Sequence, residues 1–258
     1  MPFIDSHAHL DMQEYADDLD AVLERARAAG LTHIVCIGAS SGMAGNPAAV
    51  RLAEQHPQLF ATVGIHPHDA GQITDAMWPE LRRLAAHPRV VAIGETGLDY
   101  HYDHAPREAQ RDLFARFIRL ARELHKPLVV HAREADEDIL ALLRREEADT
   151  CGGVLHSFTG GEALARGALE LNFHISFSGI LTFKNADPLR ALASALPRDR
   201  VLVETDCPFL TPVPLRGQRN EPSYVTHTAD ALARLWHVTP EEARVSTGEN
   251  AARLFRLP

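Results

Sequence analysis

The chain starts with a short apolar strand that runs into paired histidines, Phe3-Ile4-Asp5-Ser6-His7-Ala8-His9-Leu10-Asp11. Because the side chains of a strand alternate between its two faces, His7 and His9 point the same way. Two imidazoles on one face, with a carboxylate on either side, form half of a metal site. Such pairs also occur by chance at strand ends, so the meaning of this one depends on what the rest of the chain supplies.

Further apolar runs follow along the chain in a regular rhythm. Strands are predicted at Phe3–Asp5, His33–Gly38, Ala61–Ile65, Val90–Gly94, Leu128–His131, Val154–His156, His174–Ser178 and Val201–Glu204. Most of these runs are continuous rather than alternating, which is typical of parallel strands covered by helices. Helices are predicted at roughly Leu19–Ala29, Pro47–Gln55, Asp75–Ala86, Pro106–Leu124, Glu134–Glu146, Glu162–Leu171, Pro188–Ala195 and Tyr224–Trp236. One more helix begins with Thr239 as its N-cap and Pro240 at its first position.

This alternation predicts an α/β protein with the architecture of a (β/α)8 TIM barrel and an extra C-terminal helix. The alternative is an open, doubly wound sheet. Such a sheet usually has a glycine-rich phosphate loop after its first strand, and no G-x-G-x-x-G pattern is present here. No linker, low-complexity tract or charge run divides the chain, so a single domain over residues 1–258 is predicted.

Composition and charge are those of an ordinary globular enzyme, with 45% hydrophobic and 24% charged residues. The net charge of −9 argues against a protein that coats nucleic acid through its overall field. A local basic patch could still bind phosphate.

Cellular location is predicted from the cysteines and from the start of the chain. Cys36, Cys151 and Cys207 are odd in number and contain no C-x-x-C pair, as in reduced intracellular proteins. The first strand follows Met1 within three residues, which leaves no room for a signal peptide, and no apolar run is long enough to cross a membrane. A cytoplasmic location without a membrane partner is therefore expected. The protein is also expected to be a monomer.

Polar residues cluster where the predicted strands end. In a barrel, the chemistry collects at the carboxyl ends of the strands. Four histidines and two carboxylates would emerge there from five strands: His7, His9, Glu95, His131, His156 and Asp206. Burying six such groups together would be very costly without a cation to neutralise them. The set as a whole predicts a metal-dependent enzyme.

A longer series of motifs makes the sequence similar to a known family. The motifs are Asp5-Ser6-His7-Ala8-His9-Leu10-Asp11, Gly64-Ile65-His66-Pro67-His68, Gly94-Glu95-Thr96-Gly97-Leu98-Asp99-Tyr100, His131-Ala132-Arg133, His156-Ser157-Phe158-Thr159-Gly160, Ser178-Gly179-Ile180-Leu181-Thr182-Phe183-Lys184-Asn185, Glu204-Thr205-Asp206, Arg216-Gly217-Gln218-Arg219-Asn220-Glu221-Pro222 and Asn250. In this order they resemble the TatD family of metal-dependent deoxyribonucleases, within the wider amidohydrolase-like barrel group. The resemblance covers nearly the whole chain.

The resemblance implies a pair of divalent metal ions. His7 and His9 would hold one ion with Asp206, Glu95 would bridge the two, and His131 and His156 would hold the second. Imidazole and carboxylate ligands suit Zn²⁺ or Mn²⁺ better than Mg²⁺, although the family is similar to many nucleases in accepting added Mg²⁺ or Mn²⁺.

Two carboxylates have further roles to distinguish. Asp206 and Glu95 are the expected catalytic residues, with Asp206 placed to take a proton from the attacking water. Glu204 shares a strand face with Asp206. It is expected either to bind a third metal ion or to hydrogen-bond a ligating histidine.

Candidate substrate contacts lie in three loops. His66 and His68 flank Pro67 and could contact a phosphate, or simply pack within their loop. Arg133 shares a strand face with His131, and a guanidinium suits phosphate; a surface ion pair is the alternative. Arg216 and Arg219 follow the last strand beside the mouth of the barrel, where phosphate sites are frequent. Arg219 could instead pair with Glu221. Tyr100 and Tyr102 could stack on a nucleobase or pack within their loop.

Three classes of function remain open at this point. The resemblance favours a nuclease that cleaves DNA phosphodiesters, as a 3′–5′ exonuclease on single-stranded or frayed ends. The second class is a hydrolase of a small molecule or an aminoacyl ester. Many barrels of the wider group bridge their metals with a carboxylated lysine, whereas Glu95 occupies that strand here, and this favours the nuclease. The third class, a non-enzymatic metal-binding scaffold, would not need a cationic rim of His66, Arg133, Arg216 and Arg219.

Overall fold

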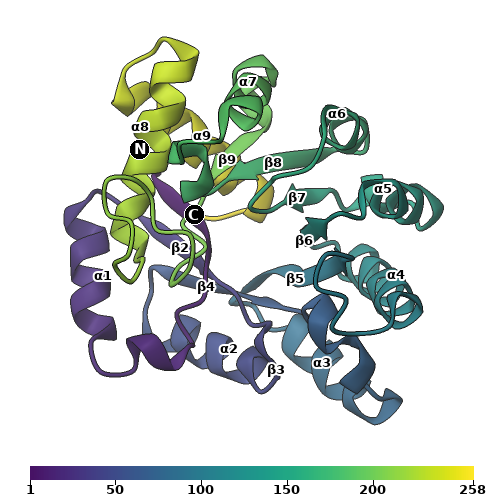
Figure 1. Cartoon of the computed structure of the whole chain (residues 1–258). Helices are drawn as coiled ribbons and strands as arrows, with labels where there is room; N and C mark the ends of the chain where they lie inside the picture. The colour runs from purple at the N-terminus through teal and green to yellow at the C-terminus, as the bar shows by residue number, and fades with distance from the viewer.

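The computed structural model describes residues 1–258 as a ring of parallel strands surrounded by helices (Figure 1). The eight-stranded sheet has the order β1-β2-β4-β5-β6-β7-β8-β9. Its strands are β1 (Ile4–Ala8), β2 (His33–Cys36), β4 (Leu59–Val63), β5 (Val90–Asp99), β6 (Leu128–Arg133), β7 (Gly153–Leu155), β8 (Phe173–Phe177) and β9 (Val201–Val203). Every neighbouring pair is parallel. The predicted (β/α)8 barrel is confirmed.

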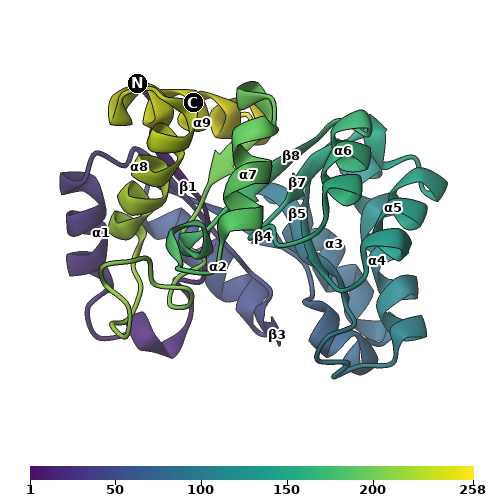
Figure 2. The same ribbon diagram turned by 45° about the horizontal axis from the view of Figure 1, so that its top comes forward.

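Helices stand on the outside of the strands, as Figure 2 shows from a second direction. They are α1 (Leu19–Ala28), α2 (Gly45–Gln55), α3 (Trp78–Ala85), α4 (Arg107–Leu124), α5 (Asp136–Arg145), α6 (Glu162–Glu170), α7 (Asp187–Ala195), α8 (Val225–Trp236) and α9 (Pro240–Phe255). A short strand that the sequence did not predict, β3 (Ser40–Met43), packs beside α2 outside the sheet. None of the helices combines the length and apolar composition that a membrane span requires.

The extra C-terminal helix α9 begins as predicted. The Thr239 hydroxyl accepts a hydrogen bond from the Glu242 backbone N–H at 3.2 Å, and the Glu242 carboxylate accepts one from the Thr239 N–H at 2.7 Å. This reciprocal capping box satisfies two backbone donors that a helix start leaves free.

Two apolar clusters define the core. The larger lies between the barrel and its helices. The smaller contains Ile4, Val35, Ile37, Ala92, Val129, Val154 and Leu202, and it includes Ala251 and Phe255 from α9. Phe255 is buried, so α9 covers the end of the barrel at which the strands start. The opposite end is left for polar side chains.

The barrel closes between β9 and β1 through a short seam. Ala8 forms an isolated parallel bridge with Cys207, and the His9 backbone N–H donates to the Cys207 carbonyl at 2.9 Å. The Asp206 N–H donates to the His7 carbonyl at 3.0 Å. These bonds bring the paired histidines of the first strand against Asp206, about 200 residues later in the sequence.

Candidate metal centre

Two strands carry an extra residue where they contribute to the centre. Between Asp5 and Ala8, β1 advances three positions while β2 advances two, and His7 lies in this irregular stretch. Between Gly94 and Thr96, β5 advances two positions while β6 advances one, and Glu95 is the extra residue. A bulge re-aims the side chains that follow it. In both strands it turns a polar residue toward the mouth above an apolar barrel interior.

The first part of the centre surrounds the two N-terminal histidines. The Nε2 atoms of His7 and His9 lie 3.2 Å apart, which confirms that the two rings face the same way. Asp206 Oδ1 lies 3.5 Å from His7 Nε2 and 3.2 Å from His9 Nε2. Glu95 Oε2 is 3.4 Å from His7 Nε2 and 3.9 Å from His9 Nε2. Four potential ligands therefore converge on one small volume.

The other oxygen of Glu95 serves a second group of histidines. Glu95 Oε1 lies 2.7 Å from His156 Nε2, 3.0 Å from His131 Nδ1 and 3.5 Å from His66 Nε2. Glu95 is nearly inaccessible to solvent, with 3% of its side chain exposed. Its two oxygens thus face two different sets of donors, the arrangement expected of a bridging carboxylate.

These side chains fit divalent cations by the chemistry of their donors. Three groups each bring ligand atoms within 4.8 Å of one another: His7 with His9 and Glu95, His7 with His156 and Asp206, and His66 with Glu95 and His131. The groupings place His66 among the potential ligands, whereas the sequence pointed to it as a phosphate contact. They also place His156 near His7, and the two rings stack with centroids 3.9 Å apart.

Burial and mutual contact set the charges of these groups. Burial alone would raise the pKa of Glu95, but His156, His66 and His131 together hold it well below its usual range. Asp206 is likewise held below its usual pKa against burial, mainly by His9. Burial lowers the pKa of His66 to about 3, so its imidazole is neutral and can offer a lone pair. The same carboxylates raise the pKa of His9, His131 and His156, so a cation that binds here must displace protons from those rings, whereas His66 already offers a free lone pair.

Neighbouring groups hold three of the histidines from behind. His9 Nδ1 lies 2.7 Å from Ser40 Oγ, which itself donates to Asp11 at 2.8 Å. His156 Nδ1 lies 3.2 Å from Glu204 Oε1, one of the two outcomes expected of Glu204. Glu204 Oε1 also accepts the Ser157 backbone N–H at 2.7 Å, while its buried Oε2 has no hydrogen-bond partner. A partner behind a ligating ring fixes which nitrogen keeps its proton.

Asp99 holds the third of these histidines, and the sequence analysis did not single it out. Its Oδ2 lies 3.0 Å from His131 Nε2 and 3.0 Å from His68 Nε2. A proton on Nε2, donated to Asp99, would leave the Nδ1 lone pair of His131 free for a metal ion on the Glu95 side. The sequence did contain a signal for Asp99, because Glu95, Gly97 and Asp99 follow one another at the two-residue period of a strand.

A cavity of about 490 Å³ gives access to the centre. Among the predicted substrate contacts, His66, His68 and Arg133 line it. Arg216 and Arg219 do not: Arg216 donates to the Thr211 carbonyl and lies over the Phe183 ring at 4.1 Å. Arg219 forms a two-pronged ion pair with Asp18, at 2.7 and 2.9 Å, rather than one with Glu221. Glu221 is paired with Arg25 instead.

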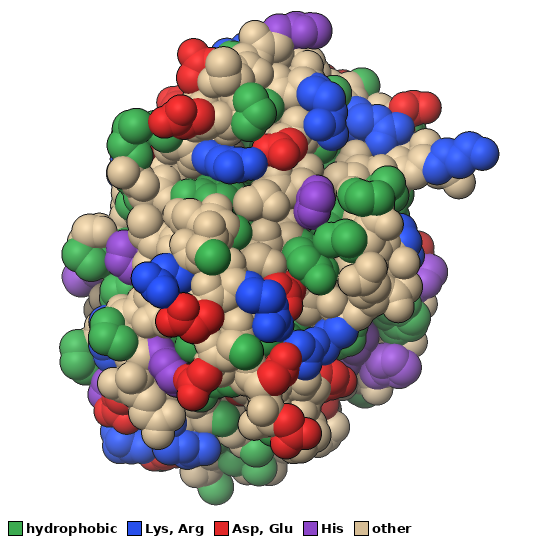
Figure 3. Space-filling model, turned by 90° about the vertical axis from the view of Figure 1, so that its left-hand side faces the viewer, with side chains coloured by type: hydrophobic (Ala, Val, Ile, Leu, Met, Phe, Trp, Pro, Cys, Tyr) green, Lys and Arg blue, Asp and Glu red, His purple; other side chains and the backbone are tan.

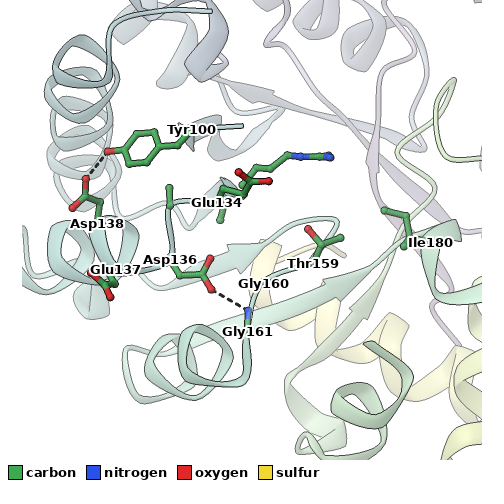
Figure 4. A pocket seen from close by; sticks show the side chains of 12 residues that line it. Tyr100, Glu134, Asp136, Glu137, Asp138, Thr159, Gly160, Gly161 and Ile180 are labelled. Atoms are coloured by element: carbon green, nitrogen blue, oxygen red, sulfur yellow. Dashed lines mark hydrogen bonds between the residues drawn. The ribbon is translucent and has the colours of Figure 1, made fainter. Parts of the chain in front are cut away.

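A second pocket beside this cavity is acidic (Figure 4). It measures about 690 Å³, shares Arg133 and Thr159 with the first cavity, and is lined by Glu134, Asp136, Glu137 and Asp138. Asp138 accepts a hydrogen bond from the Tyr100 hydroxyl, so Tyr100 packs here and does not line the first cavity. The carboxylates would repel a phosphate backbone on this side of the mouth.

The outer surface offers no compensating block of positive charge on the face that Figure 3 shows. Basic and acidic side chains are interspersed there, in keeping with the net charge of −9. This face therefore offers no extended basic surface for a polyanion.

Comparison with known proteins agrees with this geometry. A sequence model of the family described as TatD related DNase matches residues 4–256. The chain is 44% identical over 253 residues to a Bacillus subtilis (strain 168) protein named uncharacterized metal-dependent hydrolase YabD, with 98% of each chain covered. It is 35% identical over 252 residues to a Cronobacter sakazakii protein named 3'-5' ssDNA/RNA exonuclease TatD, with 96% of this chain and 95% of the other covered. Among solved structures, a TatD homolog, YJJV from Escherichia coli K12, has a TM-score of 0.91 at 29% identity, covering 99% of this chain and 98% of that one.

Proposed function

The chain belongs to the TatD-related DNases, a family of metal-dependent hydrolases, and on that premise we propose that it degrades single-stranded DNA from its 3′ end by hydrolysing phosphodiester bonds. One observation carries the proposal. Buried Glu95 directs its two oxygens at separate sets of histidines, inside a cavity that also exposes a guanidinium. The Cronobacter sakazakii relative, named as a 3'-5' ssDNA/RNA exonuclease, supports the polarity and the strand preference.

Different residues would bind each of the two proposed metal ions. His7, His9 and Asp206 would hold one divalent cation, His131 and His156 a second, and Glu95 would be shared between them. His66, which groups with Glu95 and His131, lies within reach of the second. Such cations would polarise the phosphodiester and lower the pKa of a water molecule. Zn²⁺, Mn²⁺ and Mg²⁺ remain the candidate ions, the first two being favoured by the imidazoles.

Asp206 and Arg133 act on the substrate side. Asp206 is ionised and faces the cavity, so it can accept the proton of the attacking water. Arg133 borders the cavity and can bind a phosphate oxygen of the strand. Arg216 and Arg219 lie outside the cavity lining and are held by other groups of the protein, so in this proposal they do not contact the strand.

Size and charge of the mouth support a single-stranded substrate. A cavity of about 490 Å³ takes in roughly one or two nucleotides of one strand, and the acidic pocket beside it disfavours a second backbone. The three free cysteines support our further proposal that the enzyme works in the cytoplasm, and we propose that it does so as a monomer.

A substrate comparison with matched variants tests this function. We expect metal-loaded protein to degrade a single-stranded oligonucleotide faster than a blunt duplex. Asp206→Asn should reduce turnover about 10²–10⁴-fold, the usual cost of losing a general base. Asp187→Asn, at an exposed carboxylate outside both pockets that pairs only with Arg190, is the matched control and should retain turnover. Rapid hydrolysis of a small or aminoacyl ester by a protein that leaves DNA intact would contradict the nuclease and support the ester hydrolase.

A further inference from the structure

Two aromatic side chains are exposed, and both lie at the mouth of the metal centre. The chain has ten Phe, four Tyr and two Trp residues. Of these, only Tyr102, at 53%, and Phe209, at 49%, are exposed, and both line the cavity that contains Glu95 and His131. A single exposed aromatic residue needs no explanation. Two that line one functional cavity, in a chain whose other aromatic residues are wholly or partly buried, point to a ligand.

The backbone beneath Phe209 is held in place by the centre and by a buried amide. The Phe209 N–H donates to the Asp206 carbonyl at 3.0 Å. Fully buried Asn220 donates from Nδ2 to the Phe209 carbonyl at 2.5 Å and to the Thr205 carbonyl at 2.9 Å. The ring lies edge-to-face with His9, at 5.9 Å between centroids. Phe209 is thus fixed beside one side of the metal centre.

Tyr102 is held in the same way on the other side. Its N–H donates at 2.9 Å to Asp99 Oδ1, while the other oxygen of Asp99 bonds His131 and His68. The ring is edge-to-face with His68 at 5.6 Å, the Arg133 guanidinium lies over it at 5.4 Å from its centroid, and the His104 ring lies parallel to it at 5.7 Å between centroids. A base that stacks on Tyr102 takes the place of one of these last two neighbours. Tyr102 therefore adjoins His68 and Arg133, on the side of the centre where Asp99 holds His131.

We propose that Phe209 and Tyr102 form a base-stacking bracket, in which each ring stacks on one of the two nucleobases that flank the phosphate at the metal centre. The proposal rests on the proposed function and specifies how the strand is held. Base–aromatic stacking accepts every base, because every base has a flat π-face. Because the backbone beneath each ring is already held, binding has to order only the two side-chain torsions of each residue. The bracket allows an acidic protein to bind nucleic acid through contacts that do not depend on charge.

Position-specific removal of a base tests the bracket directly. The probe is a fluorescein-labelled oligothymidylate with phosphorothioate linkages at its 3′ end, carrying one abasic site that is moved along the strand. Its dissociation constant is measured by anisotropy with the metal-loaded protein. For the wild type, we expect an abasic site at either flanking position to weaken binding about 5- to 150-fold, the contribution of one stacked base.

Each aromatic residue should account for one of those two positions. Phe209→Ala should weaken binding of the intact strand by the same factor and remove the penalty at one position, while Tyr102→Ala removes it at the other. Phe209→Trp should retain the penalty. Both rings are half exposed, so truncating them leaves no buried cavity. Val213→Ala, which truncates an exposed residue of the same loop outside the cavity, is the matched control.

Salt dependence separates stacking from phosphate contact. Phe209→Ala should leave the slope of log affinity against log salt unchanged, whereas Arg133→Ala should make it shallower. The bracket is overturned if the wild-type protein cleaves DNA but binds strands with an abasic site at any position as tightly as the intact strand. It is also overturned if the loss of binding free energy from the abasic site and the loss from the alanine substitution are additive. A wild type that neither binds nor cleaves DNA overturns the proposed function, and the bracket with it.

Discussion

Replacing Asp99 by asparagine should weaken metal binding without removing any ligand. The carboxylate accepts four hydrogen bonds: His131 Nε2 and His68 Nε2 reach Oδ2 at 3.0 Å each. The backbone N–H groups of His101 and Tyr102 reach Oδ1 at 3.0 and 2.9 Å. An asparagine has one acceptor oxygen, so its NH₂ group must face one of these two pairs of donors.

The magnitude follows from which pair loses its acceptor. If the NH₂ faces the imidazoles, His131 must accept at Nε2, and its proton moves to Nδ1, which lies 3.0 Å from Glu95 Oε1. The lone pair that His131 offers to a metal is then lost. Changes of this kind behind a ligating histidine cost about 10- to 100-fold in metal affinity, or about 1.4–2.8 kcal/mol at 1.4 kcal/mol per tenfold. If the NH₂ faces the backbone donors instead, the loop that carries Tyr102 is released.

Chelator competition with metal-free protein measures this effect for Mn²⁺ and Zn²⁺. Asp187→Asn is the matched control, because Asp187 is exposed and pairs only with Arg190. Thermal unfolding of the metal-free variants shows how much of any change reflects the fold. Wild-type metal affinity in a folded Asp99→Asn variant would refute the role of Asp99 in orienting His131.

Three further predictions concern the barrel, its pH dependence and the basic residues at its rim. Gly97→Ala should abolish metal binding, because a Cβ at residue 97 would lie 2.0 Å from the carbonyl oxygen of the proposed ligand His131. Elemental analysis measures the metal content, and full occupancy in the variant would contradict the prediction. Burial lowers the pKa of His174 from 6.5 to about 4, so as the pH falls the unfolded chain takes up this proton before the folded protein does. The free energy of unfolding should therefore fall by about 3 kcal/mol between about pH 6.5 and about pH 4. Denaturant titrations of the wild type and His174→Gln should show a flatter profile in the variant, and equal profiles would contradict the assignment. Arg133→Ala should make the slope of log affinity against log salt shallower by about 0.7 for single-strand binding. Arg219→Ala, which breaks the pair with Asp18, should leave that slope unchanged and lower the melting temperature. Equal slopes for the wild type and Arg133→Ala would contradict the phosphate contact of Arg133.

The strand and helix pattern could be predicted because it depends on local periodicity. Each of the eight predicted strands coincides with a strand of the barrel. The largest discrepancy is β5, which continues to Asp99 rather than ending at Gly94, since Thr96 and the residues after it remain paired with β6. The β3 segment, Ser40–Met43, was missed because it lacks an apolar run.

Contacts between distant residues were harder to predict. The sequence indicated that His7 and His9 face the same way, and the 3.2 Å separation of their Nε2 atoms confirms it. It could not indicate that Arg219 pairs with Asp18, 201 residues away, because ion pairs between loops depend on how the whole barrel closes. The bulge that directs Glu95 into the mouth is likewise a property of strand pairing.

An oligonucleotide labelled separately at each end tests the central proposal most directly. The protein is stripped of metal by a chelator and then assayed with and without added Mn²⁺. We expect no cleavage without metal. With Mn²⁺ we expect immediate release of the 3′ label as a mononucleotide, while the strand that carries the 5′ label shortens stepwise. An intact oligonucleotide in the presence of Mn²⁺, from a protein shown to contain its metals, would contradict the proposed function.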